Sequence, residues 1–194
     1  MKKMVLVLTL LMTGCNENNS ETKWQGRCFP NKYLSEASFI NSNKGDNALD
    51  KELSKAPILF FPANYVVQHI KKFQPVDYQN DESPLNNFIS VNLLPHRKLE
   101  RNVNASFFNT FSDAKDLYIP VEHEKYSFTL YTKSENTFLY WGSCEYSAVD
   151  NYSCFRDIEF ENMNISYLVN QDNISIHKKI DDFIIEHLNN WQCE

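Results

Sequence analysis

A long amphipathic segment near the C-terminus limits the folds that this chain of 194 residues can adopt. Charged side chains alternate there with large, mostly apolar ones at helical spacing, which is typical of a helix with one buried face. Asn173 or Ser175 is expected to cap its first turn. Such a helix needs a second layer that covers its stripe. The stripe consists of Ile176, Ile180, Phe183, Ile184, His187, Leu188 and Trp191.

The second layer is predicted by short β-rich runs that precede this helix. Polar residues at 133–136 and 162–164 are suited to the turns between neighbouring runs. Two short helices are expected over residues 47–55 and 65–73. The predicted fold class is α+β, with a mainly antiparallel sheet and the C-terminal amphipathic helix packed on one face. The strand-like runs are residues 58–61, 88–94, 126–132, 137–141, 155–160 and 165–169.

The first fifteen residues have the layout of an export signal. A basic start at Lys2 and Lys3 precedes an apolar run over residues 4–12. This run is too short to span a bilayer, which takes roughly 20 residues. The residues that follow resemble the lipobox of bacterial lipoproteins: Leu11-Met12-Thr13-Gly14-Cys15. A plain secretory signal and an uncleaved anchor are the alternatives.

The lipobox resemblance implies a division of the chain and a location. Residues 1–14 would be a signal peptide, and Cys15 would carry palmitate or a related acyl chain that holds the protein on a lipid membrane. Asn16 at the next position implies the outer membrane, with the protein facing the periplasm. Residues 15–27 are expected to be the lipidated cysteine and a flexible tether. Residues 28–194 are expected to form a single periplasmic domain.

The four cysteines after Cys15 are expected to form two disulfides, because an exported chain folds in an oxidising compartment. Three pairings are possible. We favour Cys28–Cys193, which ties the two ends of the domain together, and Cys144–Cys154, which would staple a polar loop. A metal site is the alternative, but no C-x-x-C motif or histidine pair supports it, so we expect no metal.

The charge of the chain bears on its partners. Removal of residues 1–14 takes Lys2 and Lys3 from the 19 basic residues and none of the 25 acidic ones, so the formal net charge becomes −8. An acidic chain without a lysine or arginine cluster is not suited to nucleic acid. The acidity either only keeps the surface soluble or serves a protein partner with a basic face.

A search for catalytic motifs gives no positive case for an enzyme, and no cofactor is expected. The glycines after the signal, Gly26, Gly45 and Gly142, form no phosphate-binding loop. The pair His123-Glu124 begins like a zinc-protease motif, but Ser127 stands where the second histidine belongs. The sequence does not exclude a catalytic pair of carboxylates from distant segments, since the two members of such a pair need not be close in sequence.

Aromatic residues gather around the segment between Cys144 and Cys154. Tyrosine and tryptophan are favoured at interfaces because they combine a large area with a polar end. We therefore predict that Trp141, Tyr146 and Tyr152 form a binding element on a loop held by the disulfide. The alternative is that these side chains pack in the core.

A further resemblance concerns the last third of the chain, through Ile165-Ser166-Tyr167 and then Lys179-Ile180-Asp181 at the start of the terminal helix. These segments resemble the ending of some immunity lipoproteins that counter toxins delivered by type VI secretion. The resemblance implies a periplasmic protein that covers the active site of a toxin. The expected function is protein binding, with an immunity protein as the leading hypothesis. A structural or assembly lipoprotein of the cell envelope is the alternative.

Overall fold

The computed structural model describes residues 21–36, 53, 55–75, 88–99, 107–135, 137–148 and 151–193. Residues 1–20, which include the predicted signal peptide and Cys15, lie outside the described residues, as does most of the helix expected over 47–55. None of the described helices is long and apolar enough to cross a membrane.

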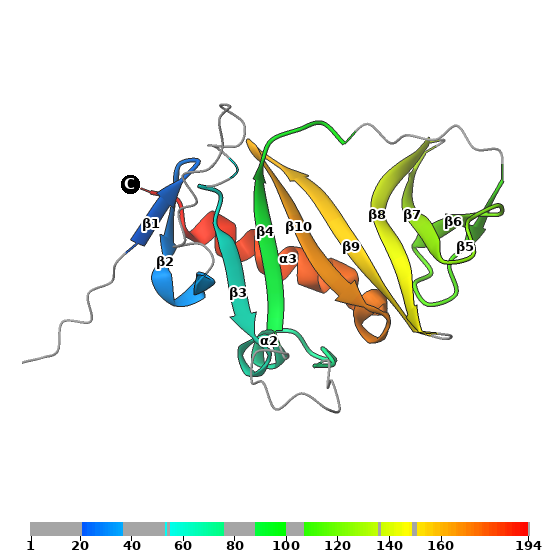
Figure 1. The fold of residues 1–194 in the computed structure, drawn as a ribbon, viewed down its shortest axis with the longest axis horizontal. Coiled ribbons are helices and arrows are strands. Elements are labelled where there is room, and N and C mark those ends of the chain that lie inside the picture. Colours follow the sequence, from blue (N-terminus) through cyan, green and yellow to red (C-terminus); the bar gives the residue numbers. More distant parts are fainter. Residues whose placement is uncertain are drawn as a thin grey trace, which may run out of the picture.

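Eight antiparallel strands form one sheet in the order β3-β4-β10-β9-β8-β7-β6-β5. The helix α3, His177–Asn190, lies across one face of this sheet, behind β4, β10 and β9 in the view of Figure 1. The α+β fold class is therefore confirmed. The strands are β3 (Ile58–Pro62), β4 (Phe88–Pro95), β5 (Phe108–Thr110), β6 (Leu117–Pro120), β7 (Ser127–Ser134), β8 (Thr137–Ala148), β9 (Asn151–Phe160) and β10 (Met163–Asn170).

The core lies between this sheet and α3. The apolar stripe of the helix is buried at Ile180, Phe183, Ile184 and Leu188. The facing strands contribute alternate residues, as a half-buried sheet requires. The ring of Phe61 on β3, for example, meets that of Phe183 edge-on at 5.0 Å between centroids.

The residue at the N-cap of α3 is not one of the two that the sequence predicted. A 3-10 helix, η4 (Gln171–Ile176), leads into α3, and neither Asn173 nor Ser175 is at its N-cap position, which Ile176 occupies. Asn173 is buried and instead exchanges two hydrogen bonds with the backbone of Gln74, at 2.7 and 2.8 Å. It therefore holds the segment after α2 (Ala63–His69) against the end of β10.

Part of the segment that was predicted to be a flexible tether forms an N-terminal hairpin. The strands β1 (Glu21–Trp24) and β2 (Arg27–Pro30) pair antiparallel around Gln25 and Gly26, both with positive φ, as a two-residue hairpin turn requires. Trp24 is buried in the core, so residues 21–27 are part of the folded domain and the expectation of a flexible tether there is wrong. The polar composition of residues 16–27 concealed this turn.

Both favoured disulfides are present. Cys28–Cys193 joins β2 to the end of the chain across 165 residues. Cys144–Cys154 joins directly opposite residues of β8 and β9, whose Cα atoms are 3.9 Å apart. The segment 145–153 is therefore mostly two paired strands rather than the expected loop, because the pairing of β8 with β9 continues beyond the disulfide to Ala148 and Asn151.

Candidate functional site

The three aromatic residues predicted to bind a partner do not share one surface. Trp141 is fully buried and Tyr152 is 4% exposed, whereas Tyr146 is 40% exposed. The binding prediction is therefore wrong for Trp141 and Tyr152. Tyr152 packs against Phe111 and Phe128 and donates its hydroxyl hydrogen to Asp113 at 2.8 Å.

Trp141 turns inward because of an irregularity in strand pairing. Leu130 of β7 is opposite Gly142, but the next residue, Tyr131, is opposite Tyr140, which leaves Trp141 as an extra residue in β8. A bulge of this kind redirects a side chain. The indole Nε1 of Trp141 donates to Nδ1 of His177 on α3 at 3.2 Å.

The histidine that receives this bond belongs to a buried polar network. Since Nδ1 of His177 accepts a hydrogen from Trp141, the ring carries its own hydrogen on Nε2, which donates to Asp116 at 3.2 Å. Burial lowers the pKa of His177, although the carboxylates of Asp116 and Asp181 oppose this effect. The neutral ring therefore serves as a link between α3, β8 and the turn that precedes β6.

Arg156 forms the second half of this network. Its guanidinium lies over the Trp141 ring, donates to the Trp141 carbonyl oxygen at 2.8 Å and pairs with Asp181 of α3 at 3.0 Å. Tyr167 donates its hydroxyl hydrogen to the same carboxylate. These groups satisfy one another, and none of them lines the cavity described next. Their arrangement fixes α3 to the sheet, which is a structural role.

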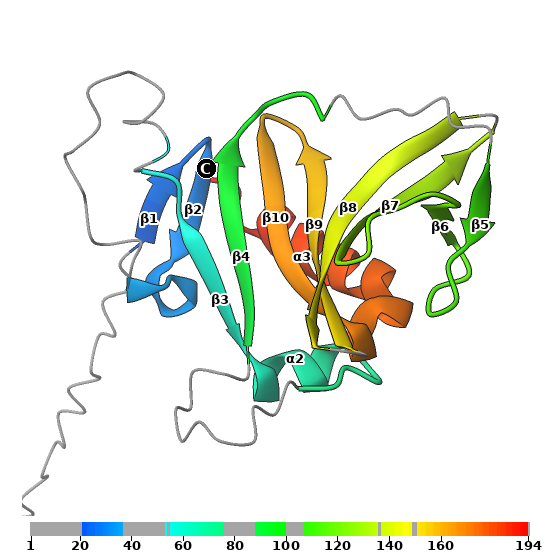
Figure 2. The same cartoon turned by 45° about the vertical axis from the view of Figure 1, so that its right-hand side comes forward.

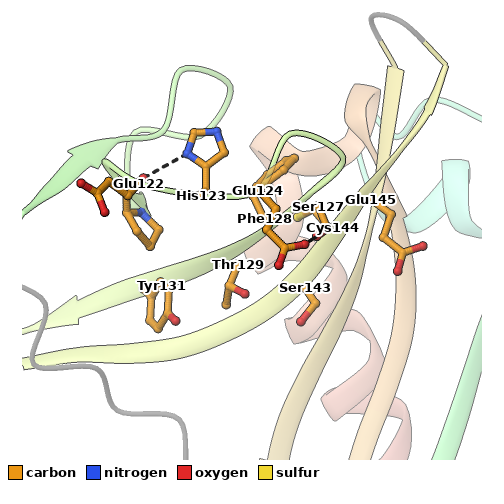
Figure 3. Close-up of a pocket in the computed structure, with 11 residues that line it drawn as sticks. Glu122, His123, Glu124, Ser127, Phe128, Thr129, Tyr131, Ser143, Cys144 and Glu145 are labelled. Carbon is orange, nitrogen blue, oxygen red and sulfur yellow. Dashed lines mark hydrogen bonds between the residues drawn. The ribbon is translucent and has the colours of Figure 1, made fainter.

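A cavity of about 390 Å³ lies beside the loop between β6 and β7. The strands β6 and β7 pair through Leu117 with Thr132 and Tyr118 with Tyr131, and residues 121–126 between them form a loop beside the cavity. In Figure 3 this loop lies beside β7 and β8, and Thr129 and Ser143 project from those strands on the same side. The lining includes Glu122, His123, Glu124, Ser127, Thr129, Ser143 and Glu145.

The mouth of the cavity is acidic. Glu122, Glu124 and Glu145 are exposed, and we call them the acidic rim. Glu124 accepts a hydrogen bond from Ser127 at 2.9 Å, and His123 contacts the carbonyl oxygen of Pro120 through Nδ1 at 3.2 Å. Among the described residues, no group of histidine, cysteine or carboxylate side chains could hold a metal ion. The rim is suited to a cationic side chain of a partner.

Two exposed tyrosines lie near the acidic rim along the chain, at the end of the β7–β8 pair, and neither lines the cavity. Tyr126 is 70% and Tyr146 is 40% exposed, and we call them the aromatic pair. The backbone N–H of Tyr146 donates to the carbonyl oxygen of Tyr126 at 3.1 Å, so the two residues are adjacent. The ring of Tyr146 contacts Phe128 and Tyr152, on the face of β8 opposite to Glu145.

The sequence analysis identified Tyr146 as a binding residue but placed Tyr126 in a strand. Tyr126 follows Lys125 and the run Glu122–Glu124, and such a polar context is typical of an exposed position.

Exposed apolar side chains occur along most of the large sheet. Two of the large ones among the described residues are Leu53, which precedes β3, and Val67 of α2. The others lie on or next to β5 to β10: Phe107, Val121, Tyr126, Leu139, Tyr146, Phe155 and Leu168. Among them, Phe155 is paired with Leu168 and Tyr126 is adjacent to Tyr146, and large exposed apolar side chains that lie together mark interaction surfaces.

Comparison with known proteins adds no family to this description. No protein-family model matches the chain, and neither the curated proteins nor the solved structures include a significant match.

Proposed function

We propose that the chain is a lipoprotein of the cell envelope that acts by binding a protein with a basic contact face. The observation that carries this proposal is the acidic rim of the cavity, together with the exposed aromatic pair at the end of the β7–β8 pair. Carboxylates that surround a cavity attract a basic partner over distance, and exposed tyrosines contribute contact area at short range.

The strand that carries Glu145 is held in place by a disulfide, and this rigidity is also suited to binding. Glu145 and Tyr146 follow Cys144 directly on β8, and the Cys144–Cys154 disulfide joins this strand to β9. A contact surface that is rigid before binding loses little conformational freedom on association. We infer that the hairpin of β8 and β9 presents a preorganised contact surface.

The leading role is that of an immunity protein, which neutralises a toxin from a neighbouring cell by occupying its active site. The resemblance of residues 11–15 to a lipobox supports a lipid anchor on Cys15, at the outer membrane and facing the periplasm. The net charge of −8 after removal of the signal supports a basic partner. In this role the chain needs no catalytic residue and no cofactor of its own.

Photo-crosslinking in living cells tests whether the rim and the aromatic pair contact a protein. A photoreactive phenylalanine analogue replaces Tyr126 or Tyr146, and Val67 on α2, which is 45% exposed, is the matched control. We expect one protein of basic isoelectric point to be captured from both tyrosine positions and not from Val67. Charge reversal by Glu122→Lys together with Glu145→Lys should reduce this adduct, because it removes the attraction that speeds association.

The same charge change elsewhere controls for the net charge. Glu21 and Glu36 are exposed residues near the N-terminal hairpin, so Glu21→Lys together with Glu36→Lys should leave the adduct unchanged. Equal adducts from the tyrosine positions and from Val67 would contradict the proposal, as would equal losses from the two charge reversals.

A further inference from the structure

The face of the large sheet opposite α3 has an apolar centre. Among the described residues no helix lies across this face, which is turned toward the reader in Figure 1 and partly to the side in Figure 2. Phe155 of β9 pairs with Leu168 of β10. Their side chains are 50% and 45% exposed, so two large apolar groups stand side by side near the middle of the sheet. We call this face, centred on Phe155 and Leu168, the open face.

The charged side chains that the strands of the open face contribute to it have one sign, and the cations Arg97 and Lys98 of the segment after β4 lie at its edge. Asp157 and Glu159 follow Phe155 at alternate positions of β9, and strand alternation places all three on the same side. Asp157 accepts a hydrogen bond from Tyr140, and Glu159 accepts one from the backbone of Leu99. The strands β3, β4, β8, β9 and β10 contain a single lysine or arginine, Arg156, and that side chain reaches Asp181 on the helix side.

The open face is continuous with the cavity. Ser143 lines the cavity and is directly opposite Phe155 in the pairing of β8 with β9. Glu145, a member of the acidic rim, lies two residues further along β8 on the same side of the strand. A path of neighbouring side chains therefore runs from the rim to Leu168 without leaving the sheet surface.

The size of a stable interface favours the use of both surfaces. A specific complex buries about 800 Å² on each partner, with an apolar centre and a polar margin. A cavity of about 390 Å³ with three carboxylates offers a polar margin but little apolar area. The open face supplies the apolar centre. A second copy of this chain would place like charges against Asp157 and Glu159, which disfavours self-association.

We propose that the basic protein bound at the acidic rim also covers the open face, with Phe155 and Leu168 as the apolar centre of the contact. This inference rests on the proposed function and identifies where most of its contact area lies. The partner's contact surface is correspondingly broad, apolar in the middle and basic at the edges.

The test uses the full-length chain in its own cells, with a photoreactive phenylalanine analogue at Phe155 or at Leu168. Leu139 of β8 is the matched control, because it is a strand residue of similar exposure, 39%, in the same half of the molecule. We expect Phe155 and Leu168 to capture the same protein as Tyr126, and Leu139 to capture much less of it. With the photoreactive group at Tyr126, Leu168→Asp should reduce the adduct about tenfold or more, and Leu139→Asp should not.

The outcomes separate this inference from the proposed function. Capture from Tyr126 without capture from Phe155 and Leu168 would overturn the open face as a contact and leave the proposed function standing. Capture of a different protein, or of a second copy of this chain, from Phe155 would also overturn it. Absence of capture from Tyr126, Tyr146 and both open-face positions would overturn the two proposals together. Circular dichroism of each variant confirms that the change has not unfolded the domain.

Discussion

Trp141→Ala should lower the free energy of unfolding of the domain by about 3–5 kcal/mol, the range typical of removing a large aromatic side chain from a core. Trp141 is fully buried, so its loss leaves a cavity between β8 and α3. The substitution also removes the hydrogen that Nδ1 of His177 accepts and the ring beneath Arg156. Denaturant unfolding of residues 16–194 measures the change.

Tyr146→Ala is the matched comparison, because it removes an aromatic side chain from the same strand at a site that is 40% exposed. We expect it to change the free energy of unfolding by less than about 1 kcal/mol, as is usual for surface positions. A Trp141→Ala variant as stable as the wild type would contradict the inward turn of this side chain at the bulge.

Loss of the Cys28–Cys193 disulfide should have an effect of similar size. This bridge closes a loop of 165 residues, and a chain-entropy argument gives about 4–5 kcal/mol for so long a loop. Cys28→Ser and Cys193→Ser should lower the free energy of unfolding by similar amounts, because each opens the same loop. The double variant should be no less stable than either single one.

Backbone hydrogen bonds beside this bridge should keep the cysteine variants folded, so that their stabilities can be compared. The backbone N–H of Cys28 donates to the carbonyl oxygen of Trp191 at 2.8 Å, and that of Cys193 donates to Gly26 at 3.1 Å. These bonds hold the N-terminal hairpin against the end of the chain even without the bridge, so the variants should still fold. Clearly unequal losses in the two single variants would indicate that the cysteines do not pair with each other.

Local patterns explain which parts of the fold could be predicted. The stripe of α3 repeats along one segment, and the strands of the hairpin at residues 126–141 adjoin their own turn, so both signals are contained in a few consecutive residues. The disulfide pairing was among three possibilities, and the structure has the favoured one.

The parts that could not be predicted depend on contacts between distant segments. The inward turn of Trp141 follows from its extra position against β7, which composition does not reveal. The order of residues 21–27 depends on Trp24 reaching the core and on contacts with the C-terminus. The acidic rim joins two residues of the loop between β6 and β7 with Glu145 of another strand, β8.

We propose that the chain protects its cell by binding a protein, and survival of a deletion strain tests this proposed role. Cells that lack the gene are mixed on a surface with wild-type cells of the same strain, so that neighbours are in contact. We expect the deletion strain to be killed, and the wild-type gene to restore its survival. The variant with Glu122→Lys and Glu145→Lys should fail to restore it, whereas the variant with Glu21→Lys and Glu36→Lys should succeed. Undiminished survival of the deletion strain among wild-type neighbours would contradict the proposed protective role.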